Sequence, residues 1–277
     1  MEANKIKGEA KSIILDNGIE LTYCEKGVQN KEVLLCGAFY FHTFMPVVEL
    51  LAEKYHVYGI VMRLDGKADE LNSDNTINWT KQWGKDFYNF VKKLNINKFH
   101  YFGKCHGTVP GWYFVKNHPE MLITFSSYFL APHILEQTAN QWFELMQGNN
   151  PTEMMKAALR KPEKGIKAKM EEMASLGKID FGSVENYAGN FSKYLWDSKG
   201  DCINTLKTTN VPIEYLFGTE DIFFKDHYDS NMFAIMNTNN AKTVFLGNEK
   251  HLMELDCPEK IASEVFYFIN EVEKNYN

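Results

Sequence analysis

The pentapeptide 103–107, Gly-Lys-Cys-His-Gly, constrains the fold of this 277-residue chain more than any other feature. An apolar run at 99–102 precedes it and a helical pattern at 108–118 follows it, so a strand turns directly into a helix there. Such a turn strains the backbone of its central residue, and side chains larger than glycine on either side would clash. The pattern predicts that Cys105 stands above the C-terminal edge of a sheet, where the helix N-terminus lowers the pKa of a thiol. Taken alone, the pentapeptide also suits a small cysteine buried in a tight turn.

Short β-rich runs alternate with helical stretches, which indicates an α/β fold with a mostly parallel sheet covered by helices. An Asn-Gly dipeptide at 17–18, between two apolar runs, predicts that the chain opens with an antiparallel hairpin. Eight strands are expected, at 11–15, 19–23, 32–35, 57–62, 99–102, 123–130, 211–217 and 242–246. The main helices of the core are expected at 43–54, 79–94, 108–118 and 258–273.

The alternation stops between residues 132 and 210, where the sequence becomes helical and rich in methionine. We therefore expect a helical cap at 132–210, inserted into a core formed by 1–131 and 211–277. Methionine is flexible and polarizable, so this stretch suits an adaptable apolar binding surface, although ordinary packing between helices is the more frequent explanation of such a pattern.

Composition excludes several classes of protein and partner. Hydrophobic residues make up 44% of the chain, enough for a large core, and the net charge of −6 with scattered basic residues offers no surface for nucleic acid or an anionic membrane. The chain lacks the apolar stretch of about 20 residues that a membrane span needs, and its N-terminus lacks a signal-peptide core. The five cysteines are widely spaced without a Cys-x-x-Cys pair, which argues for free thiols in a reducing compartment. We expect a cytoplasmic protein, and the sequence contains no motif for a metal, nucleotide or redox cofactor.

Two later strand ends offer the partners that a nucleophilic cysteine needs. Asp221 and His251 each come directly after one of the last two expected strands, and parallel strands present such residues at one edge of a sheet. This predicts a catalytic triad of Cys105, His251 as base and Asp221 as the orienting acid, with Glu220 and Asp226 as weaker candidates for the acid. Each residue alone has a common structural explanation: a surface histidine, or an aspartate that forms a turn or caps a helix.

With nucleophile, acid and histidine in this chain order, the sequence resembles the α/β-hydrolase superfamily over nearly its whole length. Residues 218–221 match the family's Gly-x-x-Asp, and His251 followed by Pro-Glu at 258–259 matches the start of its final helix. The resemblance implies an α/β-hydrolase fold with an eight-stranded, mostly parallel sheet, an N-terminal antiparallel hairpin and an inserted helical cap. Serine is the usual nucleophile in this superfamily, so the chain resembles its cysteine variants.

The resemblance also implies an oxyanion hole built from the backbone amides of Ala38 and His106. The chain departs from the family at Cys36, where histidine is usual, and at 63–67, which only partly matches the loop after the fourth strand. Because the strands ending near Cys36 and Cys105 are neighbours in this fold, a regulatory disulfide between these thiols is a further hypothesis.

Sulfur in the nucleophile's place favours a thioester acyl-enzyme, which stays reactive toward amines, alcohols and thiols. We expect a hydrolase that cleaves an ester, thioester or lactone with an apolar or aromatic acyl group. The alternatives are an acyltransferase or cyclase of the same fold and, with less support, a non-catalytic receptor for a small molecule. The candidate substrate-lining residues are Phe39, His42, Trp112 and Trp142, and the side chain of His106 is a candidate substrate contact.

Overall fold

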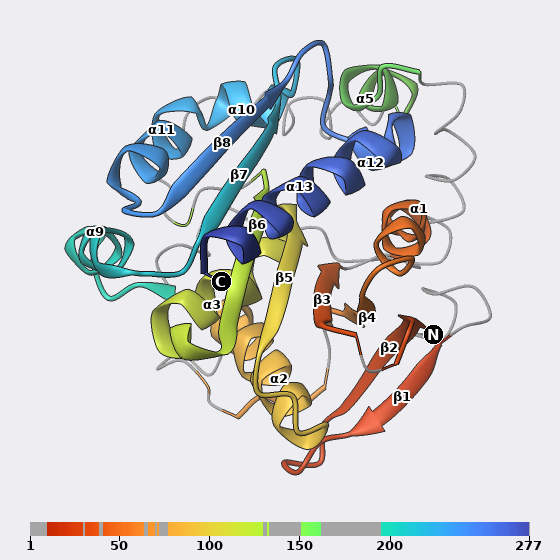
Figure 1. The fold of residues 1–277 in the computed structure, drawn as a ribbon, viewed down its shortest axis with the longest axis vertical. Helices are drawn as coiled ribbons and strands as arrows, with labels where there is room; N and C mark the ends of the chain where they lie inside the picture. Colours follow the sequence, from red (N-terminus) through yellow and green to blue (C-terminus); the bar gives the residue numbers. More distant parts are fainter. Residues whose placement is uncertain are drawn as a thin grey trace.

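The computed structural model describes residues 10–29, 31–38, 41–63, 66–69, 71, 77–129, 132, 151–161 and 195–276, and they form an α/β fold (Figure 1). The strands are β1 (Lys11–Ile14), β2 (Glu20–Gly27), β3 (Val33–Ala38), β4 (His56–Val61), β5 (Phe99–Lys104), β6 (Leu122–Tyr128), β7 (Ile213–Gly218) and β8 (Ala241–Leu246). The α-helices are α1 (Phe41–Leu51), α2 (Trp79–Lys93), α3 (Val109–Asn117), α5 (Pro151–Ala158), α9 (Lys199–Thr208), α10 (Ile222–Asp226), α11 (Tyr228–Asn237), α12 (Met253–Asp256) and α13 (Pro258–Tyr276). Two 3-10 turns, η2 (Cys105–Thr108) and η3 (Pro119–Met121), complete the set.

The strands form one eight-stranded sheet in the order β1-β2-β4-β3-β5-β6-β7-β8. The pairs β1–β2 and β2–β4 are antiparallel, and every later pair is parallel. The hairpin predicted from Asn17-Gly18 is confirmed, and Gly18 adopts the left-handed conformation with φ 79° that such a turn needs. The expected fold class, an α/β fold with an N-terminal antiparallel hairpin, is therefore correct.

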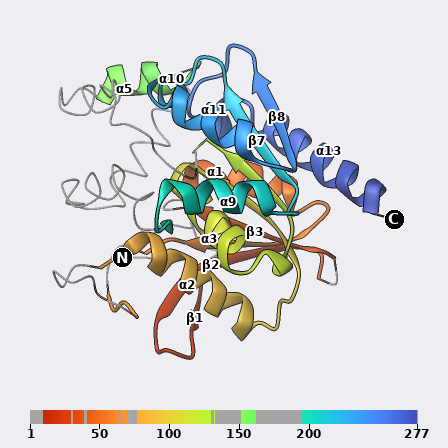
Figure 2. The same cartoon turned by 90° about the vertical axis from the view of Figure 1, so that its left-hand side faces the viewer.

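Helices cover both faces of the sheet. Helices α1 and α13 pack against each other on one face, while α2, α3 and α9 lie together on the opposite face (Figures 1 and 2). An ion pair of 2.7 Å between Lys116 of α3 and Asp201 of α9 joins two helices of that second layer. The core between the layers is strongly aromatic, and its largest fully buried side chains include Trp83, Trp112 and Tyr101. This packing fixes the strand ends from which the candidate site is built.

The elements expected from hydrophobic periodicity are present with ends shifted by a few residues. The first helix covers Phe41–Leu51 rather than 43–54, and the last runs three residues beyond the expected 273, to Tyr276. Helix α9 lies inside the segment 132–210 that was expected to be helical. Helices α10 to α12 were not predicted, because they are short or have apolar stripes too weak to stand out from their loops.

The expected cap at 132–210 lies mostly outside the described residues. Its described part includes α5, whose end docks on the segment that follows β8: the amide of Leu252 donates to the carbonyl of Ala158 at 2.8 Å, and the amide of Arg160 donates to Asp256 at 2.6 Å. Further along, Cys202 and Leu206 of α9 are fully buried in the main core. The boundaries of the cap remain a prediction.

Among the helices of the described segments, none combines the length and the apolar character that crossing a membrane requires.

Candidate active site

The turn after β5 has the geometry predicted from its two glycines. Cys105 has a φ of 51°, in the left-handed region that residues with a side chain rarely adopt, and it begins the turn η2 that leads straight into α3. A Cβ at Gly103 would lie 2.3 Å from the carbonyl oxygen of Gly107, and a Cβ at Gly107 would lie 1.9 Å from that of Gly37. Both positions therefore exclude any side chain, and the close approach to Gly37 locks the turn against the end of β3.

A buried hydrogen bond also holds this turn. The hydroxyl of Tyr101, on β5, donates to the carbonyl of Gly107 at 2.6 Å, and Thr108 donates to the carbonyl of Cys105 at 2.8 Å. A strained backbone conformation at a single residue persists only where the surrounding contacts hold that residue in place. These contacts supply that support for Cys105.

Asp221 and His251 lie together at the same sheet edge. The Nδ1 atom of His251 is 3.0 Å from Oδ2 of Asp221, and Asp221 is fully buried. The other carboxylate oxygen of Asp221 accepts a hydrogen bond from the amide of Phe223 at 2.8 Å, which caps α10. Asp221 thus acts both as a helix cap, its common structural role, and as the partner that orients the histidine. Glu220, one of the two weaker candidates for the acid, instead forms an exposed ion pair with Lys225.

Two imidazoles flank the sulfur of Cys105. His251 lies near enough to the thiol to affect its pKa, and Nδ1 of His106 lies 3.4 Å from Sγ. Burial alone would raise the pKa of Cys105, but His106 and His251 together hold this pKa well below its usual value. Burial would likewise lower the pKa of His251, but the charge of Asp221 raises it to about 9. The arrangement favours a thiolate beside an imidazolium at neutral pH.

Two aromatic rings lie against His251, and neither was among the site residues predicted from the sequence. The ring of Phe223 lies 4.1 Å from the imidazole between centroids, and the ring of Phe129 meets it edge-on at 5.1 Å. Phe129 follows β6 directly and has a φ of 50°, a second strained residue at this edge. Its place just after a parallel strand was the available signal, since all such positions face the same edge.

Buried polar contacts tie the histidine loop to the ends of β5 and β6. The hydroxyl of Tyr128 donates to the carbonyl of His251 and accepts from the amide of Met253 at 3.2 Å. Lys104, immediately before the nucleophile, forms an ion pair with Glu254, whose side chain is fully buried. These residues are 150 positions apart, so no local pattern marks them as partners.

The side chain of His106 has its own support behind it. Its ring meets Trp83 of α2 edge-on, with centroids 6.4 Å apart, and the Trp83 indole donates to the carbonyl of Arg63 at 2.8 Å. Arg63 in turn forms a buried, two-pronged ion pair with Asp86, at 2.7 and 3.2 Å. The imidazole of His106 therefore packs against a buried group of side chains that hydrogen bonds and an ion pair hold in place.

Comparisons with known proteins bear on this fold. No family model and no curated protein matches the sequence. Among solved structures, a hydrolase from Pseudomonas aeruginosa is similar, with a TM-score of 0.70 and 15% identity over 95% of this chain and 99% of that one. A 2-hydroxy-6-oxo-6-phenylhexa-2,4-dienoate hydrolase from a Rhodococcus species has a TM-score of 0.70 and 12% identity over 94% and 99% of the two chains. A naproxen esterase from Bacillus subtilis has a TM-score of 0.67 and 15% identity over 96% and 93%.

The chain has the α/β-hydrolase fold. Cys105, Asp221 and His251 occupy the ends of β5, β7 and β8, the places where this fold carries nucleophile, acid and histidine.

The other residues expected in the site of this α/β-hydrolase fold differ in where the structure places them. His106 is the second residue of the turn η2, where the first amides have no partner within the turn, and Ala38 is the last residue of β3 and pairs with Val61 of β4. Trp112 belongs to α3 and is fully buried, with its ring 4.8 Å from that of Phe125, so it packs in the core away from the candidate site. Phe39, Trp142 and the side chain of His42 lie outside the described residues.

The hypothesis of a disulfide between Cys36 and Cys105 finds no support in the sheet register. Cys36 lies opposite Phe102, and both Gly103 and Lys104 stand between Phe102 and Cys105. Lys104 is already about 7 Å further along the strand than Phe102. Disulfides need Cα atoms closer than about 7 Å, and Cys105 lies beyond that point. Both thiols are free in this structure.

Proposed function

We propose that this chain is an acyl-cleaving hydrolase in which Cys105 attacks the carbonyl carbon of an ester, thioester or lactone. The observation that carries the proposal is the position of Cys105: it sits at a strained turn near His251, whose Nδ1 is 3.0 Å from a carboxylate oxygen of the buried Asp221. Strain and a matched base at one strand end are features of a nucleophile held ready for reaction.

The proposed reaction has two stages. The Cys105 proton passes to His251, and the thiolate forms a C–S bond while the carbonyl π electrons move to oxygen, where the amides of His106 and Ala38 stabilise the charge. The intermediate collapses to a thioester as the leaving group departs with the proton of His251. Water then attacks the thioester, gives its proton to His251, and releases the acid and the Cys105 thiol. Asp221 holds the imidazole in orientation and stabilises its charged form throughout.

The side chain of His106 has a role in this proposal as well. Its Nδ1 is 3.4 Å from Sγ, close enough to donate a hydrogen bond to the thiolate, whereas His251 carries the proton that moves. Two donors on one sulfur stabilise the thiolate before any substrate binds. The second imidazole keeps that stabilisation when His251 gives up its proton.

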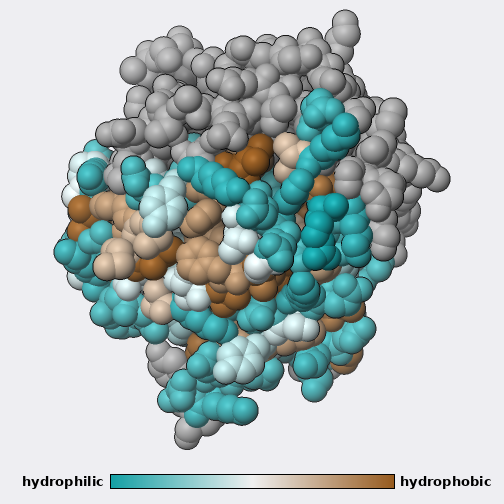
Figure 3. All heavy atoms as spheres, turned by 90° about the horizontal axis from the view of Figure 1, so that it is seen from above, coloured by the Kyte–Doolittle hydropathy of each residue, from teal (hydrophilic) through white to brown (hydrophobic). Residues whose placement is uncertain are grey.

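Apolar surroundings support an apolar acyl group. Phe129 and Phe223 lie against His251, and the upper face of the molecule shows an area of hydrophobic residues among hydrophilic ones (Figure 3). One of the similar structures is named a naproxen esterase, which agrees with an ester as substrate. The cysteine itself keeps acyl transfer open as a second function, because a thioester passes its acyl group readily to amines and thiols.

The test is to trap an acyl group on Cys105. The purified protein is mixed with a series of p-nitrophenyl esters, acyl thioesters and lactones, and its intact mass is recorded within seconds. We expect an adduct on the parent and none on Cys105→Ala. The other cysteines serve as an internal control, since they are buried and burial raises the pKa of Cys202 and Cys257 to about 12.

The outcomes separate the three candidate functions. Release of free acid alone supports a hydrolase, and transfer to an added amine or thiol in preference to water supports an acyltransferase. If no adduct and no turnover appear with any donor, and Cys105→Ala binds the same compounds as tightly as the parent, the chain is a receptor.

A further inference from the structure

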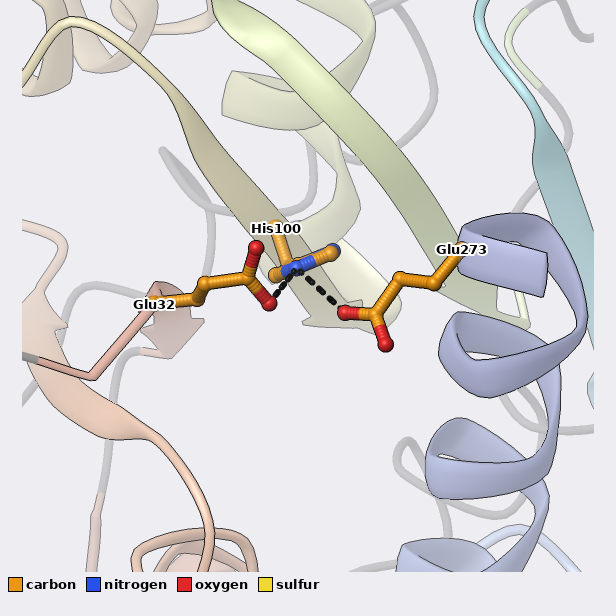
Figure 4. A group of neighbouring side chains, drawn as sticks. All are labelled: Glu32, His100 and Glu273. Carbon is orange, nitrogen blue, oxygen red and sulfur yellow. Dashed lines mark hydrogen bonds and ion pairs between the residues drawn. The ribbon is translucent and has the colours of Figure 1, made fainter. Parts of the chain in front are cut away.

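A second group of chemically capable side chains lies at the opposite edge of the sheet from Cys105. Glu32 immediately precedes β3, His100 is the second residue of β5, and Glu273 belongs to the last turn of α13 (Figure 4). One oxygen of each carboxylate and one nitrogen of His100 all lie within 4.8 Å of one another. Three segments far apart in the sequence thus bring one imidazole and two carboxylates to a single point.

The imidazole is fixed and aimed at this point. His100 is 1% exposed, and its Nδ1 atom is 2.9 Å from the hydroxyl of Thr124 on the neighbouring strand β6. Its Nε2 atom points between the two carboxylates, as Figure 4 shows. Histidines that bind metals are oriented in this way, with one ring nitrogen held by a second group and the other directed at the cation.

The distances suit a cation better than direct hydrogen bonds. Nε2 of His100 is 3.4 Å from Glu32 and 4.0 Å from Glu273, whereas good N–H···O bonds are about 2.7–3.2 Å long. Around a tetrahedral Zn²⁺ with bonds of about 2.0–2.1 Å, neighbouring ligand atoms lie about 3.3–3.4 Å apart. The distance to Glu273 would need to shorten from 4.0 Å by about 0.6 Å to reach this spacing, and its side chain is partly exposed.

We propose that Glu32, His100 and Glu273 form a binding site for one divalent transition-metal cation, Zn²⁺ in particular. One imidazole with two carboxylates is a donor set that suits Zn²⁺, whereas Mg²⁺ and Ca²⁺ prefer oxygen ligands alone.

The site is open on one side. Glu32 and Glu273 also line a hollow of about 730 Å³ between the bottom of the sheet, α3, α9 and α13. Three protein ligands and access from this hollow leave the fourth position of the cation to water or to a small ligand. A cation here would join β3 and β5 to α13.

The experiment uses the full chain after treatment with a chelator and alkylation of Cys105, so that the active-site thiol does not bind the metal. The protein is incubated with ZnCl₂, passed through a desalting column, and analysed for zinc by mass spectrometry; affinity is measured by competition with a fluorescent chelator. We expect one Zn²⁺ per chain. Glu273→Gln and His100→Asn should each weaken binding by more than about tenfold.

Glu120→Gln is the matched control. Glu120 lines the same hollow and carries the same charge but lies outside the cluster, so its replacement should leave the affinity unchanged. Zn²⁺ should also raise the melting temperature of the parent and of Glu120→Gln, but not that of Glu273→Gln, which keeps the shape of the partly exposed side chain.

Equal zinc binding by the parent, Glu273→Gln and His100→Asn would overturn the proposal, and so would the absence of zinc from the desalted parent. Because Cys105 is alkylated throughout, neither result depends on whether the chain proves to be a hydrolase.

Discussion

Gly107→Ala tests the interlock between the turn at Cys105 and the end of β3. The new Cβ would lie 1.9 Å from the carbonyl oxygen of Gly37, and real Cβ atoms essentially never come closer than 3.0 Å, so the two backbones must separate by about 1.1 Å. No side chain can move to relieve this clash, because both sides of it are main chain. Forced overpacking costs about 1–3 kcal/mol, and we expect the upper end, about 3 kcal/mol, here.

The assay is urea and thermal unfolding followed by circular dichroism, together with the rate of Cys105 alkylation. A loss of about 3 kcal/mol should lower the melting temperature by about 6–12 °C. Gly247→Ala is the control: it lies in the loop before His251, and its Cβ would meet nothing within 4 Å, so we expect a change below about 0.5 kcal/mol. If Gly107→Ala unfolds within about 0.5 kcal/mol of this control and is alkylated at the parent's rate, the interlock does not hold the nucleophile.

Three further predictions concern the charges around the sulfur. Asp221→Asn removes the charge that keeps the neighbouring histidine protonated, so the thiolate of Cys105 is lost as pH falls toward neutrality. Alkylation of Cys105 at pH 6.5 should therefore slow by at least about tenfold, while the rates above pH 9 should converge with those of the parent. His106→Ala should raise the apparent thiol pKa in the same profile, and His106→Asn, which keeps a donor near Nδ1, should raise it less; identical profiles for Ala and parent would remove the proposed role. Lys104→Met leaves Glu254 charged, buried and unpaired, and should cost about 3–5 kcal/mol in urea unfolding, with more than half recovered when Glu254→Gln is added.

The order and edge of the triad followed from the sequence because parallel strands impose them. Once 99–102, 211–217 and 242–246 are strands of one parallel sheet, the residues after them must share an edge, whatever the loops contain. Asp221 and His251 confirm this, with Nδ1 and Oδ2 3.0 Å apart.

No sequence pattern predicted the side chains that support the proposed triad. Phe129 and Lys104 depend on long-range partners, and sequence periodicity reports which face of an element is buried but not what it meets there. His100 and its two glutamates are a sharper case, since 68 residues separate the histidine from Glu32 and no spacing motif joins them. Trp112 was predictable after all: with Val109 and Val115 it forms a stripe at helical spacing, which indicates the core rather than a substrate site.

Two residues with strained backbones, Cys105 and Phe129, lie at the edge of the sheet that carries the candidate site. Cys105 and Phe129 have φ values of 51° and 50°, and each directly follows one of the adjacent strands β5 and β6. A left-handed conformation at a residue with a side chain costs of order 1–3 kcal/mol, so a turn selected only for stability would place glycine there. Glycine at 105 would remove the sulfur, and glycine at 129 would remove the ring that meets His251 edge-on. The strain is therefore retained where a side chain stands at a fixed point, which agrees with the proposed role of Cys105 as a nucleophile.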